Sequence, residues 1–126
     1  PVVSQIAESL LAQKNMSVGI ATHIDTHVII PQKKSTTLAL MFNELFTNSL
    51  KYAFSDTELK EITFTAIRQG DSITVLYKDN GKGYPNDFIK RKTSGFGRVL
   101  LEGLAQQLRA RINFYNEHGA CCMIKL

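Results

Sequence analysis

One segment, from Leu38 to Phe54, constrains the fold more than any other part of the sequence. When LALMFNELFTNSLKYAF is placed on a helix at about 100° per residue, the apolar side chains on one arc are Leu38, Phe42, Leu45, Phe46 and Ala53. Glu44, Asn48 and Lys51 recur on the opposite side, four and then three residues apart. A helix with so wide an apolar surface needs another layer to cover it.

The polar stripe has two interpretations. It is either the solvent-exposed face of an ordinary amphipathic helix or a face that meets a ligand. Leu40 and Met41 flank the stripe, and asparagine, a poor helix former, occurs twice in the segment. A metal-bound phosphate would satisfy such buried polar groups. Asn48 offers an amide oxygen to Mg²⁺, Glu44 orients a metal-bound water or acts as a base, and Lys51 pairs with a phosphate oxygen.

The order of segments predicts helices beside a mostly antiparallel sheet. Hydrophobic periodicity predicts helices over 2–14, from a cap at Ser35 or Thr36 to 53, and over 96–108. Extended segments are predicted over 17–24, 27–30, 61–68, 72–79, 112–116 and 121–126. The residues from 80 to 94 are predicted to form a polar loop. The last four extended segments form two hairpins. The fold class is therefore an α+β two-layer sandwich, built by one domain over residues 1–126.

A first glycine-rich turn, Asp79-Asn80-Gly81-Lys82-Gly83, follows the second hairpin strand directly. Alternation along that strand places Asp79 on the core side. A buried carboxylate needs hydrogen-bond donors, and the exocyclic amino group of adenine is one candidate. Gly81 and Gly83 take positive φ and let the backbone approach a flat ring. By itself the motif favours a plain turn, and a calcium-loop fragment is another alternative.

A second turn, Ser94-Gly95-Phe96-Gly97-Arg98, opens the next predicted helix. Free backbone N–H groups at a helix start bind anions, and Lys92 and Arg98 add positive charge. Alone, such a turn is most often a simple helix cap. The indication of a phosphate-binding site becomes strong because the polar helix, the first turn and the second turn follow one another in this order.

In that order the motifs resemble those of the GHKL superfamily, which comprises histidine kinases, type II topoisomerase ATPase subunits, Hsp90 chaperones and MutL repair proteins. NELFTNSLKYAF resembles its N box, DNGKG its first glycine box and SGFGRVLL its second. The resemblance covers residues 35–126 and is closest to bacterial sensor histidine kinases with the second type of dimerisation domain. It implies a Bergerat-type ATP-binding fold with a mixed, mostly antiparallel sheet.

The resemblance also implies roles for individual residues. Asn48 holds Mg²⁺, Asp79 reads adenine, and Glu44 and Lys51 carry the catalytic roles. The nucleotide-binding residues that it implies are Asn48, Lys51, Tyr52, Asp79, Gly81, Gly83, Gly95, Phe96 and Gly97. The loop from 84 to 94 corresponds to the mobile ATP lid, with Phe88 as its phenylalanine.

The sequence departs from the family pattern at two places. The second glycine box reads GFGR where relatives usually have GLGL. Before the last strand the chain has Gly119-Ala120-Cys121, where relatives often have a threonine that supports the adenine pocket.

The three histidines, His23, His27 and His118, do not lie in a helical His-box pattern. The phosphoacceptor is therefore expected upstream of Pro1 or on another chain. The predicted function is the ATP-binding half of a protein histidine kinase, which passes the γ-phosphate of ATP to a dimerisation-domain histidine in two-component signalling, with a response regulator downstream. The alternatives are an anti-sigma-factor-type kinase that phosphorylates a protein serine, and a degenerate nucleotide-binding or interaction module without phosphotransfer.

Charge and cysteine content disfavour other classes of protein. The net charge is +4, but the basic residues are scattered, so nucleic-acid binding is not expected. Cys121 and Cys122 are adjacent and would point to opposite faces of a strand, which fits a reducing, cytoplasmic setting. No apolar run is long enough to span a membrane. This domain is expected to make no membrane contact, while a membrane-anchored parent protein stays compatible.

Overall fold

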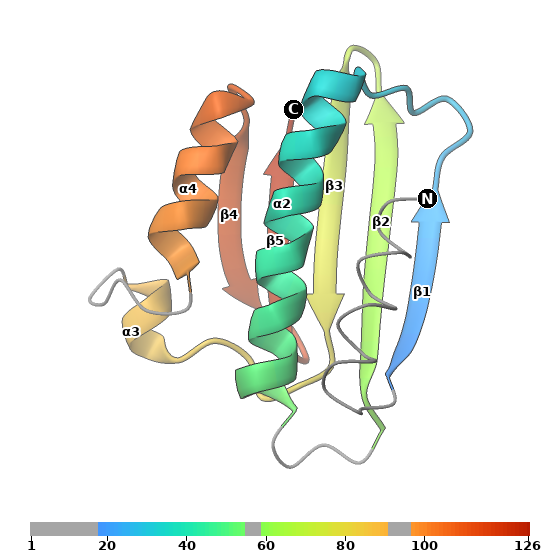
Figure 1. The fold of residues 1–126 in the computed structure, drawn as a ribbon. Helices are drawn as coiled ribbons and strands as arrows, with labels where there is room; N and C mark the ends of the chain where they lie inside the picture. Colours follow the sequence, from blue (N-terminus) through green and yellow to red (C-terminus); the bar gives the residue numbers. More distant parts are fainter. Residues whose placement is uncertain (1–17, 55–58, 91–96) are drawn as a thin grey trace.

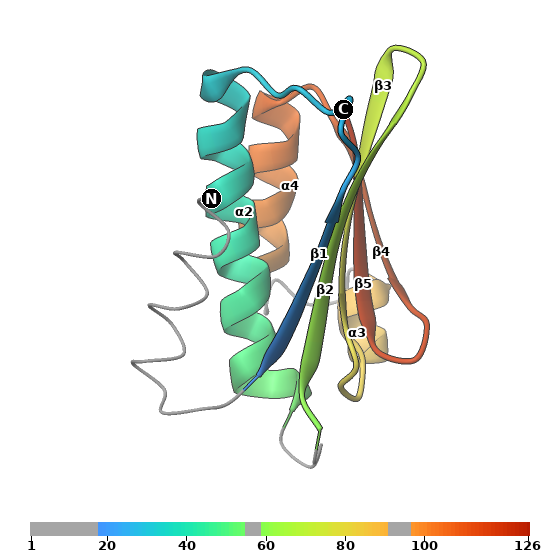
Figure 2. The same ribbon diagram turned by 90° about the vertical axis from the view of Figure 1, so that its right-hand side faces the viewer.

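The computed structural model describes residues 18–54, 59–90 and 97–126, which form helices on one face of a five-stranded sheet (Figures 1 and 2). The elements are β1 (Gly19–Ile24), α2 (Gln32–Asn48), the π-helical turn η1 (Ser49–Ala53), β2 (Glu61–Gln69), β3 (Ser72–Asp79), α3 (Asn86–Ile89), α4 (Arg98–Gln107), β4 (Arg111–Asn116) and β5 (Ala120–Lys125). The predicted two-layer α+β sandwich is confirmed.

The strand order in the sheet is β1-β2-β3-β5-β4. β1 pairs with β2 in parallel, and the other three neighbouring pairs are antiparallel. The sheet is thus mixed and mostly antiparallel, and both predicted hairpins are present. Because β5 lies between β3 and β4, the start of β5 lies beside the end of β3.

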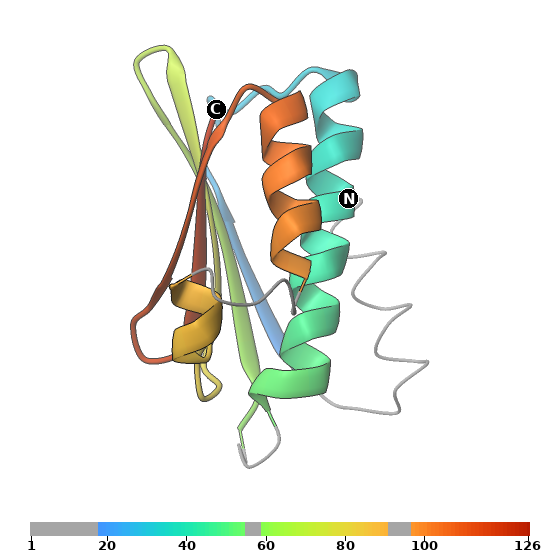
Figure 3. The same cartoon turned by 90° about the vertical axis from the view of Figure 1, so that its left-hand side faces the viewer.

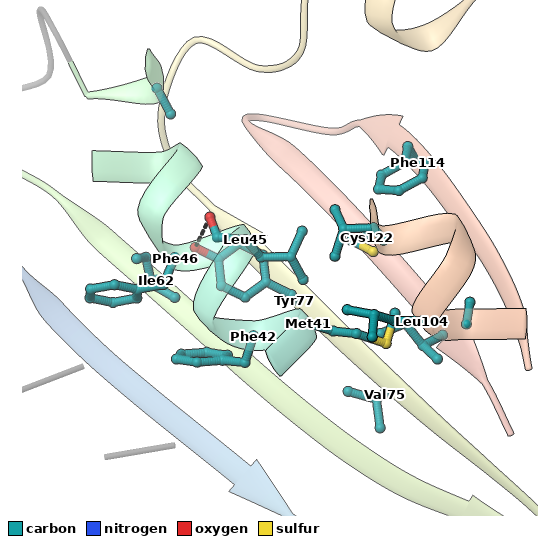
Figure 4. Close-up of a cluster of buried hydrophobic side chains, with 14 of the residues drawn as sticks. Met41, Phe42, Leu45, Phe46, Ile62, Val75, Tyr77, Leu104, Phe114 and Cys122 are labelled. Atoms are coloured by element: carbon teal, nitrogen blue, oxygen red, sulfur yellow. Dashed lines mark hydrogen bonds between the residues drawn. The ribbon is translucent and has the colours of Figure 1, made fainter. Parts of the chain in front are cut away.

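The core lies between α2, α4 and the sheet. Phe42, Leu45 and Phe46 of α2 are at most 3% exposed, and they face strand residues that include Ile62, Val75 and Tyr77 (Figure 4). Each fully buried side chain of this size contributes about 1.5–3 kcal/mol. The apolar arc of the central helix therefore attaches that helix firmly to the sheet and fixes where its polar residues lie.

The start of α2 differs from the prediction. The helix begins at Gln32, directly after Pro31, and neither Ser35 nor Thr36 caps it. Proline suits this position because its fixed φ matches the helix entry and its missing N–H is not needed there. The Ser35 hydroxyl instead donates to the carbonyl of Ile30.

The expected extended segment over 27–30 was also wrong, since no strand forms there. The Asp25 carboxylate accepts a hydrogen bond from the His27 N–H, and the Asp25 carbonyl accepts one from Val28. This local turn diverts the chain away from the sheet edge toward α2. The predicted helix over 2–14 lies outside the described residues.

Figure 3 shows α4 beside α2 on the same face of the sheet, with α3 near the start of α4. α4 begins at Arg98, two residues later than the predicted start, after Gly97 in the left-handed conformation (φ 71°). The end of α2, the end of β3 and the start of α4 thus lie toward the same end of the domain (Figure 1).

Candidate functional site

A hollow that opens to solvent lies where the end of α2, the turn after β3 and the start of β5 meet. Its lining residues are Leu45, Asn48, Ser49, Tyr52, Ala53, Asp79, Gly83, Tyr84, Pro85 and Ala120. It contains about 300 Å³ of empty space, part of which is continuous with solvent. The predicted nucleotide-binding residues among its lining are Asn48, Tyr52, Asp79 and Gly83.

The wall on the helix side is formed where α2 widens into the π-helical turn η1. Such turns are rare and occur frequently at functional sites. Asn48, Ser49 and Tyr52 line the hollow from this wall. Lys51 lies in the same turn but is exposed and does not line the hollow, so its side chain is placed at the surface beside the site.

Asp79 forms the floor of the hollow and is 2% exposed, which confirms that it points inward. Its Oδ1 accepts hydrogen bonds from the backbone N–H groups of Gly81 and Ala120, both at 3.0 Å. Its Oδ2 accepts one from the Ser49 hydroxyl at 2.7 Å. A carboxylate has about four acceptor positions. Within the described residues, these three bonds leave one of the four positions unused on a carboxylate that lines the hollow.

Two tyrosines surround this carboxylate. Burial raises the pKa of Tyr77 well above its ordinary value, the hydrogen bond between Tyr77 and Ser49 opposes the shift, and the nearby Asp79 adds to it. Burial also raises the pKa of Tyr84, whose ring lines the hollow. Both phenols therefore keep their protons at neutral pH.

The two glycines of the first turn serve different purposes. Gly83 has φ 85°, and a Cβ there would lie 2.8 Å from the Asn116 side chain, which exchanges two hydrogen bonds with the backbone of Tyr84. Gly81 does not take positive φ, which corrects that expectation. It is needed because a Cβ there would overlap the carbonyl of Ala53, to which the Lys82 N–H donates.

Glu44 faces the start of α4 rather than the hollow. A Cβ at Gly97 would overlap the Glu44 carboxylate, so this side chain lies directly against the glycine that precedes α4. A negative side chain is favourable at a helix N-terminus. Glu44 is one turn before Asn48 on α2, and the two therefore border neighbouring parts of one surface. Gly95 and Phe96 lie outside the described residues.

Arg98 was expected to add charge to an anion site, and this expectation was wrong. Its side chain is buried, and its guanidinium lies over the rings of Phe114 (4.7 Å) and Phe88 (5.3 Å). It donates to the carbonyls of Phe88 and Ile89. Aromatic faces attract a guanidinium, so Arg98 fastens α3 to α4 and β4 instead of facing a ligand.

The predicted lid phenylalanine, Phe88, is fully buried. It stacks on Tyr84 with ring centroids 4.3 Å apart and meets Phe114 edge to face at 5.1 Å. Phe88 therefore belongs to the anchored base of the predicted lid.

Sequence analysis missed Ser49, Tyr77 and Ala120 as parts of the site. In the sequence, Ser49 is a small residue between Asn48 and Lys51, which have clearer roles. Ala120 contributes only its backbone N–H to the site. The one available signal was a serine inside an otherwise apolar arc, since a buried hydroxyl needs a partner. Both Ser49 and Ala120 donate to Asp79, the first through its hydroxyl from the helix side and the second through its backbone N–H from β5.

Across residues 18–54, 59–90 and 97–126, no group of three or more His, Cys, Asp and Glu side chains could hold a metal ion. Within the same ranges, no helix has the length and apolar character needed to cross a membrane.

Comparison with known families identifies one match. The family described as "Histidine kinase-like ATPase domain" matches residues 8–125. Among curated proteins, the chain is 26% identical over 98 residues to blue-light-activated histidine kinase 2 of Erythrobacter litoralis (strain HTCC2594). That alignment covers 77% of this chain and 28% of the relative, so the chain spans less than a third of that protein's length.

Solved structures share the fold. The Erythrobacter litoralis EL346 blue-light activated histidine kinase has a TM-score of 0.83 at 24% identity, over 98% of this chain and 40% of that one. The catalytic domain of histidine kinase ThkA has a TM-score of 0.73 at 14% identity, over 99% and 90%. The mycobacterial sensor histidine kinase MprB has a TM-score of 0.76 at 12% identity, over 99% and 91%.

Proposed function

The chain belongs to the histidine kinase-like ATPase domain family, and from this we propose that it is the ATP-binding catalytic domain of a sensor histidine kinase. The domain binds ATP in the hollow at the end of α2 and transfers the γ-phosphate to a histidine on a dimerisation domain. The relationship to Erythrobacter blue-light-activated histidine kinases in sequence and fold supports this choice within the superfamily.

The observation that carries the proposal is the single open acceptor position of Asp79 at the floor of the hollow. Asp79 is buried, and its three hydrogen bonds come from Ser49, Gly81 and Ala120. A buried carboxylate with one unused position favours a ligand that donates one hydrogen bond there. The 6-amino group of adenine is such a donor, and Leu45 and Tyr84 provide apolar lining for a flat base.

Asn48 is the residue that would hold Mg²⁺. Its amide oxygen is a neutral, hard ligand, and Asn48 lines the hollow at the end of α2. Mg²⁺ takes few protein ligands and completes its coordination with water and phosphate oxygens, so one amide with a carboxylate one turn away fits this ion. When bound, the ion would neutralise part of the charge on the phosphates.

The remaining roles fall to residues that border the hollow. Glu44 of α2, whose side chain lies against the start of α4, would orient a metal-bound water or act as a base. Lys51 would reach a phosphate oxygen from the exposed turn. Gly97 would let the triphosphate approach the N-terminus of α4. Phosphoryl transfer depends mainly on such positioning and charge stabilisation.

The acceptor histidine is proposed to belong to a dimerisation domain, and a response regulator would take the phosphoryl group from it. His23 and His27, on β1 and in the turn after it, and His118, in the last hairpin turn, are all exposed and lie outside the helices of the described structure. The proposal places the domain in the cytoplasm, where ATP is available.

Calorimetric titration with ATP and Mg²⁺ tests the proposal. Asp79→Asn keeps the shape of the side chain but replaces an acceptor by an amide. We expect it to weaken ATP binding about 10–100-fold, the scale of lost hydrogen bonds to a charged group. The matched control is Asp71→Asn, in the exposed β2–β3 turn, which should bind ATP like the unmodified domain. Equal affinity of the Asp79→Asn variant and the unmodified domain would refute the proposed site.

A further inference from the structure

Two short hydrogen bonds connect the buried side chains of Asp79, Ser49 and Tyr77, and they run from the lining of the hollow into the core. The Tyr77 hydroxyl lies 2.6 Å from Ser49 Oγ, and Ser49 Oγ lies 2.7 Å from Asp79 Oδ2. The three residues are 1%, 3% and 2% exposed, respectively. Ser49 and Asp79 line the hollow, whereas Tyr77 is not part of its lining and packs against Phe42 in the core.

The number of hydroxyl hydrogens determines which group donates in each of these two hydrogen bonds. Ser49 and Tyr77 each own one hydroxyl hydrogen, and an ionised carboxylate only accepts. The 2.7 Å contact needs a hydrogen between Ser49 and Asp79, and only Ser49 can supply it. The 2.6 Å contact then needs the hydrogen of Tyr77. The more distant acceptor, the Leu45 carbonyl at 3.3 Å from the Tyr77 hydroxyl, already receives the N–H of Ser49.

The direction of these two hydrogen bonds determines which ligand groups can form a hydrogen bond at the floor. With its hydrogen bound to Asp79, the Ser49 hydroxyl cannot donate into the hollow. Asp79 then presents its open acceptor position, and Ser49 presents no hydrogen to the hollow. A ligand amino group finds an acceptor there, whereas a ligand carbonyl oxygen would meet another acceptor without a hydrogen between them.

We propose that Tyr77 is a specificity-determining positioning residue: by donating to Ser49, it commits the Ser49 hydrogen to Asp79, so that the site accepts a 6-amino purine and rejects a 6-oxo purine. This inference rests on the proposed function. The Tyr77 hydroxyl also holds Ser49 Oγ on the core side. Without this contact, the Ser49 side chain can turn toward the hollow and donate to a 6-oxo group. Because burial raises the pKa of Tyr77, the tyrosine remains a donor across the neutral range.

The test compares the dissociation constants of ATP and inosine triphosphate, whose base carries an oxygen at position 6. Tyr77→Phe keeps the ring packing and is expected to reduce the preference for ATP about tenfold, mainly by strengthening the binding of inosine triphosphate, as for one gained hydrogen bond. The double variant Tyr77→Phe with Ser49→Ala removes the rotating hydroxyl and should restore rejection of inosine triphosphate. Tyr115→Phe, on the opposite face of the sheet, is the matched control.

The results distinguish a failure of the role of Tyr77 from a failure of the proposed ATP-binding function. A Tyr77→Phe preference equal to that of the unmodified domain overturns the role of Tyr77 alone, as does a double variant that accepts inosine triphosphate as readily as the single one. An unmodified domain that binds neither nucleotide overturns the proposed function and this inference together. NMR of the unmodified domain gives a measurement that needs no variant. The slowly exchanging Tyr77 hydroxyl proton should lie next to Ser49, and a position directed at the Leu45 carbonyl overturns the proposal.

Discussion

The backbone N–H of Ala120 donates a 3.0 Å hydrogen bond to the carboxylate of Asp79, which lies 41 positions earlier in the chain. This bond exists because β5 pairs with β3, so that the start of the last strand meets the end of the second hairpin strand. The preceding Gly119 has φ 139°, and a Cβ on it would overlap the Asp79 carbonyl oxygen. The final hairpin therefore completes the floor of the site.

Gly119→Ala is expected to lower the free energy of unfolding by at least about 2 kcal/mol, because a side chain there is strained and clashes with the backbone of Asp79. ATP affinity should fall as well, because the Ala120 N–H loses its position. Chemical denaturation and ATP titration measure the two effects. Gly103→Ala is the matched control: a Cβ at Gly103, an exposed position of α4, meets nothing within 4 Å, so this change should stabilise the domain by about 0.5–1 kcal/mol. Equal stabilities of the two variants would contradict the argument.

Asn48→Ala is expected to remove the metal-dependent part of ATP binding. In Mg²⁺ the variant should bind ATP at least about tenfold more weakly, as for loss of a ligand to a charged group. Once EDTA removes the metal, the variant and the unmodified domain should bind ATP alike, because the contacts of the base are unchanged. Asn43→Ala, on the exposed side of the same helix, is the control. A deficit that persists unchanged in EDTA would assign Asn48 to the nucleotide rather than to the metal.

Arg98→Met is expected to destabilise the base of the predicted lid. The change removes the hydrogen bonds to the Phe88 and Ile89 carbonyls, and the free energy of unfolding should fall by about 1–3 kcal/mol. Hydrogen exchange should accelerate at the amides of α3. Arg111→Met, at an exposed position of β4, should leave both quantities unchanged. The idea fails if Arg98→Met leaves the stability intact and weakens only nucleotide binding, since Arg98 would then be a phosphate ligand.

Alkaline pH is expected to destabilise the domain through Cys122. This thiol is fully buried, and burial raises its pKa well above the ordinary value for a cysteine. Because the folded-state pKa is the higher one, the stabilisation is complete below the unfolded pKa and is lost as the pH rises above it. From about pH 9 the free energy of unfolding should fall by about 1.4 kcal/mol per pH unit for this group. Urea unfolding at pH 7.5, 9 and 10 measures the slope, and Cys122→Ala should reduce it. An identical slope in both proteins would exclude Cys122 as the source.

Local sequence patterns correctly predicted those features that depend on residues close together in the chain. The alternation in β3 predicted that Asp79 points inward, and it is 2% exposed. The turn at Gly70 predicted the first hairpin, which pairs Gln69 with Ser72. Such features follow from the two-residue repeat of a strand and from turn chemistry. The start of α2 failed because two signals competed, and Pro31 prevailed over the serine and threonine that follow it.

Short-range patterns in the sequence predicted the two-layer class and the inward Asp79, because both follow from periodicity over neighbouring positions. The need for glycine at 81 and 83 follows instead from Ala53 and Asn116, which are distant in the chain. Only the tertiary structure decided that Ser49 reaches Asp79 across 30 positions and that Arg98 lies between aromatic rings rather than at a ligand. These contacts depend on the strand order β3-β5-β4 and on how α2 and α4 pack on the sheet. Hydrophobic periodicity determines which face of an element is buried, but it does not determine which distant residue that face meets.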